Sequence, residues 1–407
     1  MNTAKLGNLS TAQVEEFGRE VDAIRDEVMA TRGERDRRYI LGLIRTQRSL
    51  ALGGRIVMLW SIWLLPSLGL PWSGWPQLVA VLCSGAALLG LAKIIENMEI
   101  GHNVLHAQWD WMKDPDIQSN TWEWDHVCPA DQWMHSHNVV HHTWTNVIHK
   151  DPDVGYGLMR VSTEQRWRPK YLVQPMSNVL LCLFFQWGIG THDIMWADKT
   201  GAGSKKALFR RFLWKAWRQV RKDYLLWPAL GAALTLSAWG VMQLGTLGGV
   251  TVVGQYVNPV ALALMVFSLL AGGSLIANTL RNVWTNVIIF CGHFAKGVHH
   301  FRKEDIEGES RAQWYVRQLM ASCNIGGGRL FHILSGNLSH QIEHHLFPDM
   351  CSNRYPEIAP RVRALAQRYG LPYNTGSLWR QYGSTTWTIW RLAFPGGGRV
   401  QPGKLSR

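Results

Sequence analysis

The sequence predicts an all-α integral membrane protein, with four transmembrane helices in two hairpins and a helical cap on the cytoplasmic side. Two observations lead to this prediction: apolar runs of spanning length, and basic residues that flank these runs on one side only. Each run approaches the ~20 residues that cross a hydrocarbon core. The runs are Ile56 to Trp72, Leu78 to Met98, Tyr224 to Leu247 and Val257 to Leu280. Four buried helices of a soluble protein are the alternative, but they would not explain the one-sided charge.

The charge pattern sets the orientation of the hairpins. Their connectors, Ser73 to Gln77 and Gly248 to Tyr256, are short and uncharged. The opposite flanks are basic, with Arg32, Arg35, Arg37, Arg38, Arg45, Arg48 and Arg55 before the first hairpin and Lys205, Lys206, Arg210, Arg211, Lys215, Arg218, Arg221 and Lys222 before the second. The positive-inside rule therefore places the connectors outside, and both termini and the middle segment in the cytoplasm. We expect a multi-pass protein of the inner, cytoplasmic membrane.

The composition of the chain indicates which kinds of partner it binds and which kinds of site it lacks. The formal charge of +13 favours an anionic partner. Because the basic residues lie beside apolar runs, anionic lipid is favoured, and the absence of a recognition module argues against nucleic acid. The six cysteines form no CxxC pair, so the sequence predicts neither a disulfide framework nor a thiolate metal site.

The chain is expected to form one membrane domain, residues 56–380, between two flanking segments. Residues 1–55 are predicted to hold cytoplasmic amphipathic helices, and residues 381–407 a basic C-terminal tail that is disordered from Gly396. Two further apolar stretches, Val179 to Ile189 and Val283 to Phe290, are too short to span, so we expect re-entrant or interfacial segments there.

Two amphipathic helices are predicted in the N-terminal segment. Ser10 and Gln13 have the spacing of a capping box, which opens a helix that continues to about Ala30. A second helix, around Tyr39 to Leu50, has a basic face suited to the membrane surface. A solvated helical face is an equally good interpretation of both.

Three histidine clusters carry the chemistry. His102 and His106 follow the second apolar run at a spacing that places both imidazoles on one helix face. His137, His141 and His142 form HxxxHH, in which His142 lies ~100° around the helix from His141, a geometry able to address two metals. The third cluster follows the fourth run and consists of Gln341, His344 and His345. Three clusters on the side indicated by charge are hard to explain as isolated structural histidines.

The number of histidines indicates the metal. They exceed the three or four ligands of a zinc site, which favours two adjacent metals, and redox-active iron suits the activation of dioxygen. Carboxylates near the clusters are candidates to accept the second ring N–H of a ligand histidine, although loop capping or a surface charge is as good an interpretation of each. These carboxylates are Asp110, Asp151, Asp153 and Glu343. The remaining histidines are interpreted as structural or surface residues: His126, His135, His149, His192, His299, His300 and His332.

The three clusters and the run GNLSHQIEHHLFP at 336–348 resemble the histidine boxes of membrane fatty-acid desaturases. The QIEHHLFP wording is similar to the front-end and linoleoyl-type branch. Together with HKDPD at 149–153, it also resembles the bacterial acyl-CoA desaturases. The resemblance covers roughly residues 35 to 370 and includes the two-hairpin layout.

The resemblance implies a ligand set for two iron ions in the cap. The implied ligands are His102, His106, His137, His141, His142, His344 and His345, joined by His293 outside the boxes. Gln341 holds the place of a histidine in the animal enzymes, so it is either a ligand or an outer-shell residue. His340, one turn before His344, has the same two alternatives.

The implied activity is the introduction of a cis double bond into a long acyl chain, carried by CoA or by a phospholipid, with dioxygen and two external electrons. The sequence has no HPGG haem motif and no GxGxxG fingerprint, so a ferredoxin or a flavin-type NAD(P)H reductase must supply the electrons. A membrane di-iron hydroxylase or ketolase acting on an alkane, sterol or carotenoid is the main alternative. A metal transporter would place ionisable groups near the span centres, where this chain has few.

Overall fold

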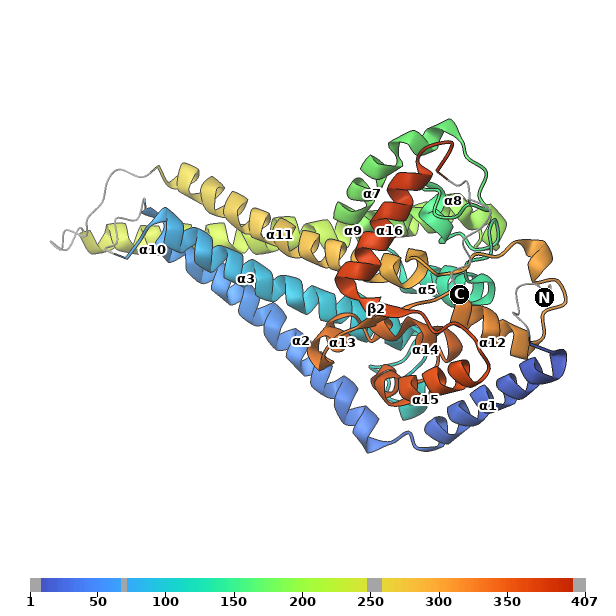
Figure 1. The fold of residues 1–407 in the computed structure, drawn as a ribbon. Helices are drawn as coiled ribbons and strands as arrows, with labels where there is room; N and C mark the ends of the chain where they lie inside the picture. The colour runs from blue at the N-terminus through green and yellow to red at the C-terminus, as the bar shows by residue number, and fades with distance from the viewer. Residues whose placement is uncertain (1–8, 67–71, 247–257, 398–407) are drawn as a thin grey trace.

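The computed structural model describes residues 9–66, 72–246 and 258–397, and the chain is mostly helical there. Figure 1 shows four long helices that run side by side to one end of the molecule, with the remaining elements gathered at the other end as a cap. The long helices are α2 (Glu34–Trp60), α3 (Trp75–Ile95), α10 (Trp227–Thr246) and α11 (Pro259–Phe294). The cap contains α1 (Thr11–Ala30), α5 (Ala130–Met134), α7 (Gln174–Leu183), α8 (Phe185–Thr200), α9 (Lys205–Val220), α12 (Arg311–Met320), α13 (Arg329–Leu334), α14 (Gln341–Leu346), α15 (Tyr355–Arg368), α16 (Leu378–Leu392) and a parallel pair of short strands, β1 (Asn324–Gly326) and β2 (Thr375–Ser377).

Three helices are long and apolar enough to cross a membrane, judged by length and composition. They span Trp75–Leu105, Lys205–Val241 and Pro259–Phe294. The second predicted run lies in α3 and the π-helical turn after it, and the third begins in the π-helical turn before α10. The fourth lies in α11 except for Asn258, its N-cap, while Leu247 and Val257 lie outside the described residues. Helical backbone continues toward the cap in all three cases: to Leu105 after the second run, from Lys205 before the third and to Phe294 after the fourth.

The first predicted run has a different structure. Helix α2 joins the predicted helix at Tyr39 to Leu50 and the start of this run, then ends at Trp60 and is followed by a 3-10 turn, η2 (Ser61–Leu64). The rest of the run includes residues 67–71, outside the described part. A membrane span at the first run, which would be the fourth span of the protein, therefore stays a prediction. α2 continues through Gly54 because it packs there on α3: a Cβ on Gly54 would lie 2.7 Å from the backbone nitrogen of Leu89 and 2.8 Å from the carbonyl oxygen of Gly85.

A single buried carboxylate connects the long helices near the cap. Asp223 lies in the π-helical turn η9 (Arg221–Leu226) that leads into α10. It pairs with Arg55 of α2 at 2.7 Å and with Lys93 of α3 at 2.8 Å, and it accepts a hydrogen bond from Asn278 of α11 at 3.1 Å. Because a buried charge is costly without partners, these contacts fix the four helices relative to one another at this level.

The two short apolar stretches differ from each other. Val283 to Phe290 is not a separate segment, since α11 continues through it to Phe294, and the expectation of a re-entrant or interfacial segment is wrong there. Val179 to Ile189 contains the junction of α7 and α8, which meet at a bend of 109°.

The structure confirms the prediction for the N-terminal end of the chain and corrects the one for the C-terminal end. The capping box of Ser10 and Gln13 opens α1, as the sequence predicts. The C-terminal tail starts later than predicted, because α16 occupies 378–392 and buries Thr385 and Ile389. Residues 398–407 lie outside the described part of the chain.

Candidate metal centre

All eight histidines implied as ligands meet in one buried cluster below the cap ends of α3 and α11. His102 and His106 follow the π-helical turn η4 (Glu96–Gly101), in and just after α4 (His102–Leu105). The second box occupies the π-helix η6 (His135–His141) and α6 (His142–Trp144), and the third lies in α14. His293 is the penultimate residue of α11. The side chains therefore come from four segments that are far apart in sequence.

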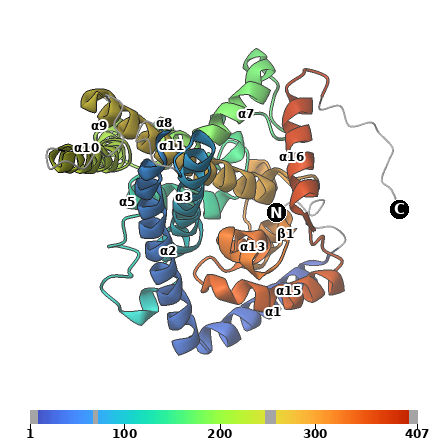
Figure 2. The ribbon, with the colours of Figure 1, turned by 90° about the vertical axis from the view of Figure 1, so that its left-hand side faces the viewer.

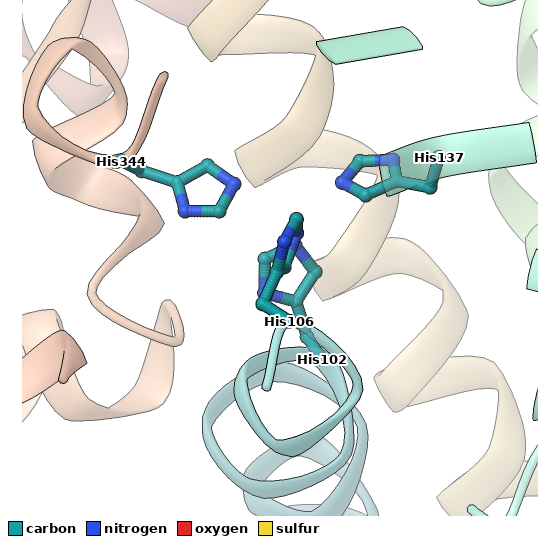
Figure 3. A group of neighbouring side chains, drawn as sticks. All are labelled: His102, His106, His137 and His344. Atoms are coloured by element: carbon teal, nitrogen blue, oxygen red, sulfur yellow. The ribbon is translucent and has the colours of Figure 1, made fainter. Parts of the chain in front are cut away.

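The ring nitrogens divide into two groups of metal-binding geometry. One nitrogen from each of His102, His106, His137 and His344 lies within 4.8 Å of the others. Figure 3 shows His137 and His344 approaching from opposite sides, while His102 and His106 come from one helix. The second group, with the same limit, contains His141, His293 and His345.

His142 lies between the two groups. It forms a further set within 4.8 Å with His344 of the first group and His345 of the second. Its ring stacks on that of His345, with centroids 4.5 Å apart. The two candidate metal positions are therefore adjacent, as the HxxxHH spacing predicts.

The second box lies on a π-helix, not on the α-helix that its spacing suggests. In η6 the backbone bonds run from residue i to i+5, which changes the direction of each side chain relative to an α-helix. His137 and His141 still stack at 5.0 Å between ring centroids, and with Asp153 they form a further set of possible ligand atoms within 4.8 Å of one another. Such π-helical turns are frequent at functional sites.

Outer partners orient four of the eight rings. An oxygen acceptor faces the Nδ1 atom of each: Asn103 Oδ1 at 3.0 Å from His102, and Gln318 Oε1 at 3.1 Å from His345. The Asp151 carboxylate lies 3.0 Å from Nδ1 of His141, and the Tyr355 hydroxyl 3.3 Å from Nδ1 of His344. A ring that donates from Nδ1 carries its lone pair on Nε2, so these four rings are set as ligands through Nε2.

The cluster fits a metal because its ring nitrogens lack other partners. Among the eight clustered histidines, all in the described part of the chain, five have a buried Nε2 atom without a hydrogen-bond partner: His106, His137, His141, His142 and His344. Buried polar atoms are nearly always paired, so a concentration of unpaired nitrogens in one place needs an additional species. A cation with a preference for imidazole satisfies all of them.

Burial keeps most of the cluster neutral. It lowers the pKa values of His137, His142, His344 and His345 well below the ordinary value, and neighbouring imidazoles lower them further. His141 is different, because the Asp151 carboxylate outweighs burial and raises the pKa of this histidine. Neutral imidazole is the form that binds metal, so the first four are ready for coordination without losing a proton.

The other predicted ligands and outer-shell residues lie at different distances from the cluster. The Gln341 amide nitrogen lies 2.9 Å from Nε2 of His293. Asp153 approaches both His141, at 3.7 Å, and His192, at 3.4 Å. Both residues therefore adjoin the centre.

Three candidates are bonded elsewhere. Asp110 accepts hydrogen bonds from the backbone and hydroxyl of Ser119, as a loop cap would. Glu343 is fully buried and accepts from Asn324 and Tyr373. The ring of His340 lies tilted by 33° against that of His332, with centroids 4.5 Å apart, and belongs to neither group of ring nitrogens.

A cavity opens beside the two groups and contains residues that the sequence did not single out. It is lined by the four histidines His102, His137, His141 and His293 and by apolar side chains that include Trp133, Tyr156, Phe185 and Ile289. His126 and His192, expected to be structural, line it too. His192 approaches Asp153 across 39 residues of sequence, so no local spacing could have indicated this contact.

Comparisons with known proteins find similar enzymes. A family model described as fatty acid desaturase matches residues 73–377. An NADPH-dependent stearoyl-CoA 9-desaturase of Mycobacterium tuberculosis is 42% identical over 392 residues, which cover 95% of this chain and 82% of the relative. An sn-1 linoleoyl-lipid 6-desaturase of a Synechocystis species is 24% identical over 307 residues, 73% of this chain and 76% of the relative. No solved structure matches the chain.

Proposed function

The chain belongs to the fatty acid desaturase family, and we propose that its histidine cluster binds two iron ions and that the adjacent cavity holds the acyl chain to be desaturated. The protein is thus an oxidoreductase that introduces a double bond into a fatty acyl chain. The observation that carries the metal assignment is the set of five buried, unpartnered Nε2 atoms within the described cluster.

The proposed ligands follow the two groups of nitrogens. His102, His106, His137 and His344 would hold one iron, and His141, His293 and His345 the other. His142 would bind between them. Gln341, whose amide lies 2.9 Å from Nε2 of His293, is proposed to act as a neighbour of the bound iron and not as a ligand, because an amide is a weaker ligand than an imidazole.

Two irons in this site would supply the oxidising power, drawn from dioxygen and two electrons, that removes two hydrogens from adjacent methylenes. The chain itself positions the substrate. Trp133, Tyr156 and Ile289 line the cavity beside His137, His141 and His293, so an acyl chain among them would place its methylenes next to the centre. Their apolar surfaces also exclude water from the reacting carbons.

The proposals for the substrate class and for the electron donor are based on the chemistry of the reaction and on the similarity to known proteins. We propose a long-chain acyl-CoA, because the mycobacterial relative is described as acting on stearoyl-CoA, with a phospholipid acyl chain as the alternative. That relative is also described as NADPH-dependent. Electrons are proposed to come from a ferredoxin or a flavin-type NAD(P)H reductase.

We propose a four-span topology with both termini in the cytoplasm. The apolar end of α2, with Leu52, Ile56 and Trp60 exposed on its surface, would begin the first crossing beside α3. The basic residues at the cap ends of α2 and α9 would face the anionic leaflet of the cytoplasmic membrane.

Product analysis tests this function. Gas chromatography with mass spectrometry of fatty acids from cells that express the chain is expected to show a new double bond, absent from cells that express His141→Ala. A hydroxylated or keto product without unsaturation would instead support the related hydroxylase or ketolase chemistry.

A further inference from the structure

Helix α16, which the sequence did not predict, presents an uncovered apolar face. In the described part of the chain, Trp379, Trp387 and Trp390 are 80%, 68% and 53% exposed, and Phe394, just beyond the helix, is 58% exposed. Their spacing places them along one side of the helix. The opposite side is buried, at Gln381, Thr385, Ile389 and Leu392.

Helix α7 continues this face. Met176, Val179 and Leu180 on its surface are 61%, 55% and 49% exposed. The side chain of Gln174, at the start of α7, donates a hydrogen bond to the carbonyl oxygen of Ile389. Figures 1 and 2 both show α7 and α16 side by side, so the two apolar surfaces belong to one region of the molecule.

Contacts with α11 show how far along that helix, and so how far from its exposed apolar part, this region lies. Leu275 and Leu280 on α11 are exposed, and every later residue of this helix is buried or half-buried. Asn282 donates a hydrogen bond of 2.8 Å to the carbonyl oxygen of Leu183, at the end of α7. At a rise of about 1.5 Å per residue, α7 is therefore attached about 3 Å beyond the last exposed residue of α11.

Helix α16 begins near the same level and extends toward the cap. Its Tyr382 packs in a cluster with Trp284 of α11, which is four residues, or about 6 Å, beyond Leu280, and its Ile389 packs in a cluster with Phe290 and Phe294 at the cap end of α11. Figures 1 and 2 show both α7 and α16 running across the direction of α11. If α11 crosses the bilayer, the two helices lie along its surface, where the hydrocarbon core ends.

The composition of the two helices matches that location. Tryptophan favours the boundary between hydrocarbon and water, and basic side chains favour anionic headgroups. Exposed Arg380 and Arg391 lie beside the tryptophans of α16, and exposed Arg166, Arg168 and Lys170 precede α7. Such apolar faces bordered by basic residues are typical of helices that lie in the plane of the interface.

We propose that α7 and α16 form one interfacial surface, immersed in the headgroup region of the cap-side leaflet and bound to anionic phospholipid. A second copy of the chain or another protein would explain the exposed tryptophans less well. The apolar surface of α7 and α16 begins along α11 where the exposed apolar residues of that helix end, as expected for a surface that meets the same membrane. The surface would hold the cap flat on the membrane independently of the metal centre.

Site-directed spin labelling of the full-length protein in nanodiscs that contain phosphatidylglycerol tests the proposal. Labels at Trp387→Cys and Met176→Cys report on α16 and α7, in a background with Cys83→Ala and Cys182→Ala, since the other four cysteines are buried. A label on native Cys83, exposed on α3, in a protein that carries only Cys182→Ala, is the control within lipid. A label at Ala12→Cys, exposed on α1, in the double-alanine background is the control in water. Collision rates with dissolved oxygen and with a water-soluble nickel chelate measure the depth of each label.

We expect the labels at 387 and 176 to favour oxygen over the nickel chelate, at ratios between those of the two controls. Nickel collisions as frequent at both positions as at Ala12→Cys would overturn the proposal. Protection from both reagents would overturn it as well, because it would show that protein, and not lipid, covers the surface.

Discussion

The Nε2 atoms of His293 and His345 lie 3.2 Å apart. Gln318 accepts from Nδ1 of His345, which leaves the lone pair of that ring on Nε2. The amide group of Gln341 also lies close to this point, 2.9 Å from Nε2 of His293. Two lone pairs that converge so closely repel each other, and a shared cation removes the repulsion.

This relationship predicts different roles for His293 and Gln341. His293→Ala is expected to abolish desaturation and to lower the iron content, because it removes a ligand. Gln341→Ala is expected to reduce turnover while most of the iron remains. Iron analysis and product yield, measured together on both variants, check this prediction.

Gly292→Ala provides a matched test of Gln341. A Cβ at Gly292 would lie 3.0 Å from Cγ and Cδ of Gln341, so the substitution should displace the amide and reproduce the effect of Gln341→Ala. Loss of iron from Gln341→Ala, together with full iron and activity in His293→Ala, would show that the two roles are reversed.

Asp151 is predicted to control metal affinity through His141. Its carboxylate fixes the ring from Nδ1 and also accepts from the backbone nitrogen of Asn146. Asp151→Asn should therefore weaken iron binding by about 10–100-fold, as losses of outer-shell partners do. Asp110→Asn makes the same chemical change at a carboxylate that caps a loop, and it should leave the affinity unchanged. Titration of iron against a competing chelator compares the two, and equal affinities would refute the role given to Asp151.

Ile289 is predicted to contribute to the space for the acyl chain. It lines the cavity beside His293, so Ile289→Trp should obstruct the chain and lower turnover at least tenfold while the iron content stays the same. Ile289→Val keeps the space open and serves as the control. Unchanged turnover in Ile289→Trp would mean that the substrate lies elsewhere.

The topology predicts the side of each hairpin end. Reporter fusions at Gly74 should be external and fusions at Lys205 internal, because the first position lies in an uncharged connector and the second begins a basic helix. An internal reporter at Gly74, or an external one at Lys205, would contradict the two-hairpin arrangement.

Local spacing explains what the sequence could predict. HxxxH, HxxxHH and QIEHH are short patterns that determine which side chains lie together on one turn, and all seven histidines in them join the cluster. His293 could be predicted from its place after the fourth apolar run. The π-helical conformation of the second box could not be predicted, because the π-helix η6 has no recognised pattern of residue types.

Long-range packing explains what the sequence left out. His192 lines the cavity because α8 folds back against the second box, and His126 lines it from the segment before α5; neither position follows from a periodic pattern in the sequence. The first predicted run merged with a preceding basic helix because the packing of Gly54 on α3 favours one continuous helix. Helix α16 was missed because its tryptophans alternate with small and polar residues, which lowers its hydropathy below that of a span.

Metal analysis of the purified protein tests the central claim most directly. We predict about two irons per chain in the active protein, because the histidines form two adjacent groups of ligands. The His142→Ala variant should lose iron, since His142 lies between both groups, whereas His332→Ala should keep it. A single stoichiometric zinc without iron in active protein would contradict the account.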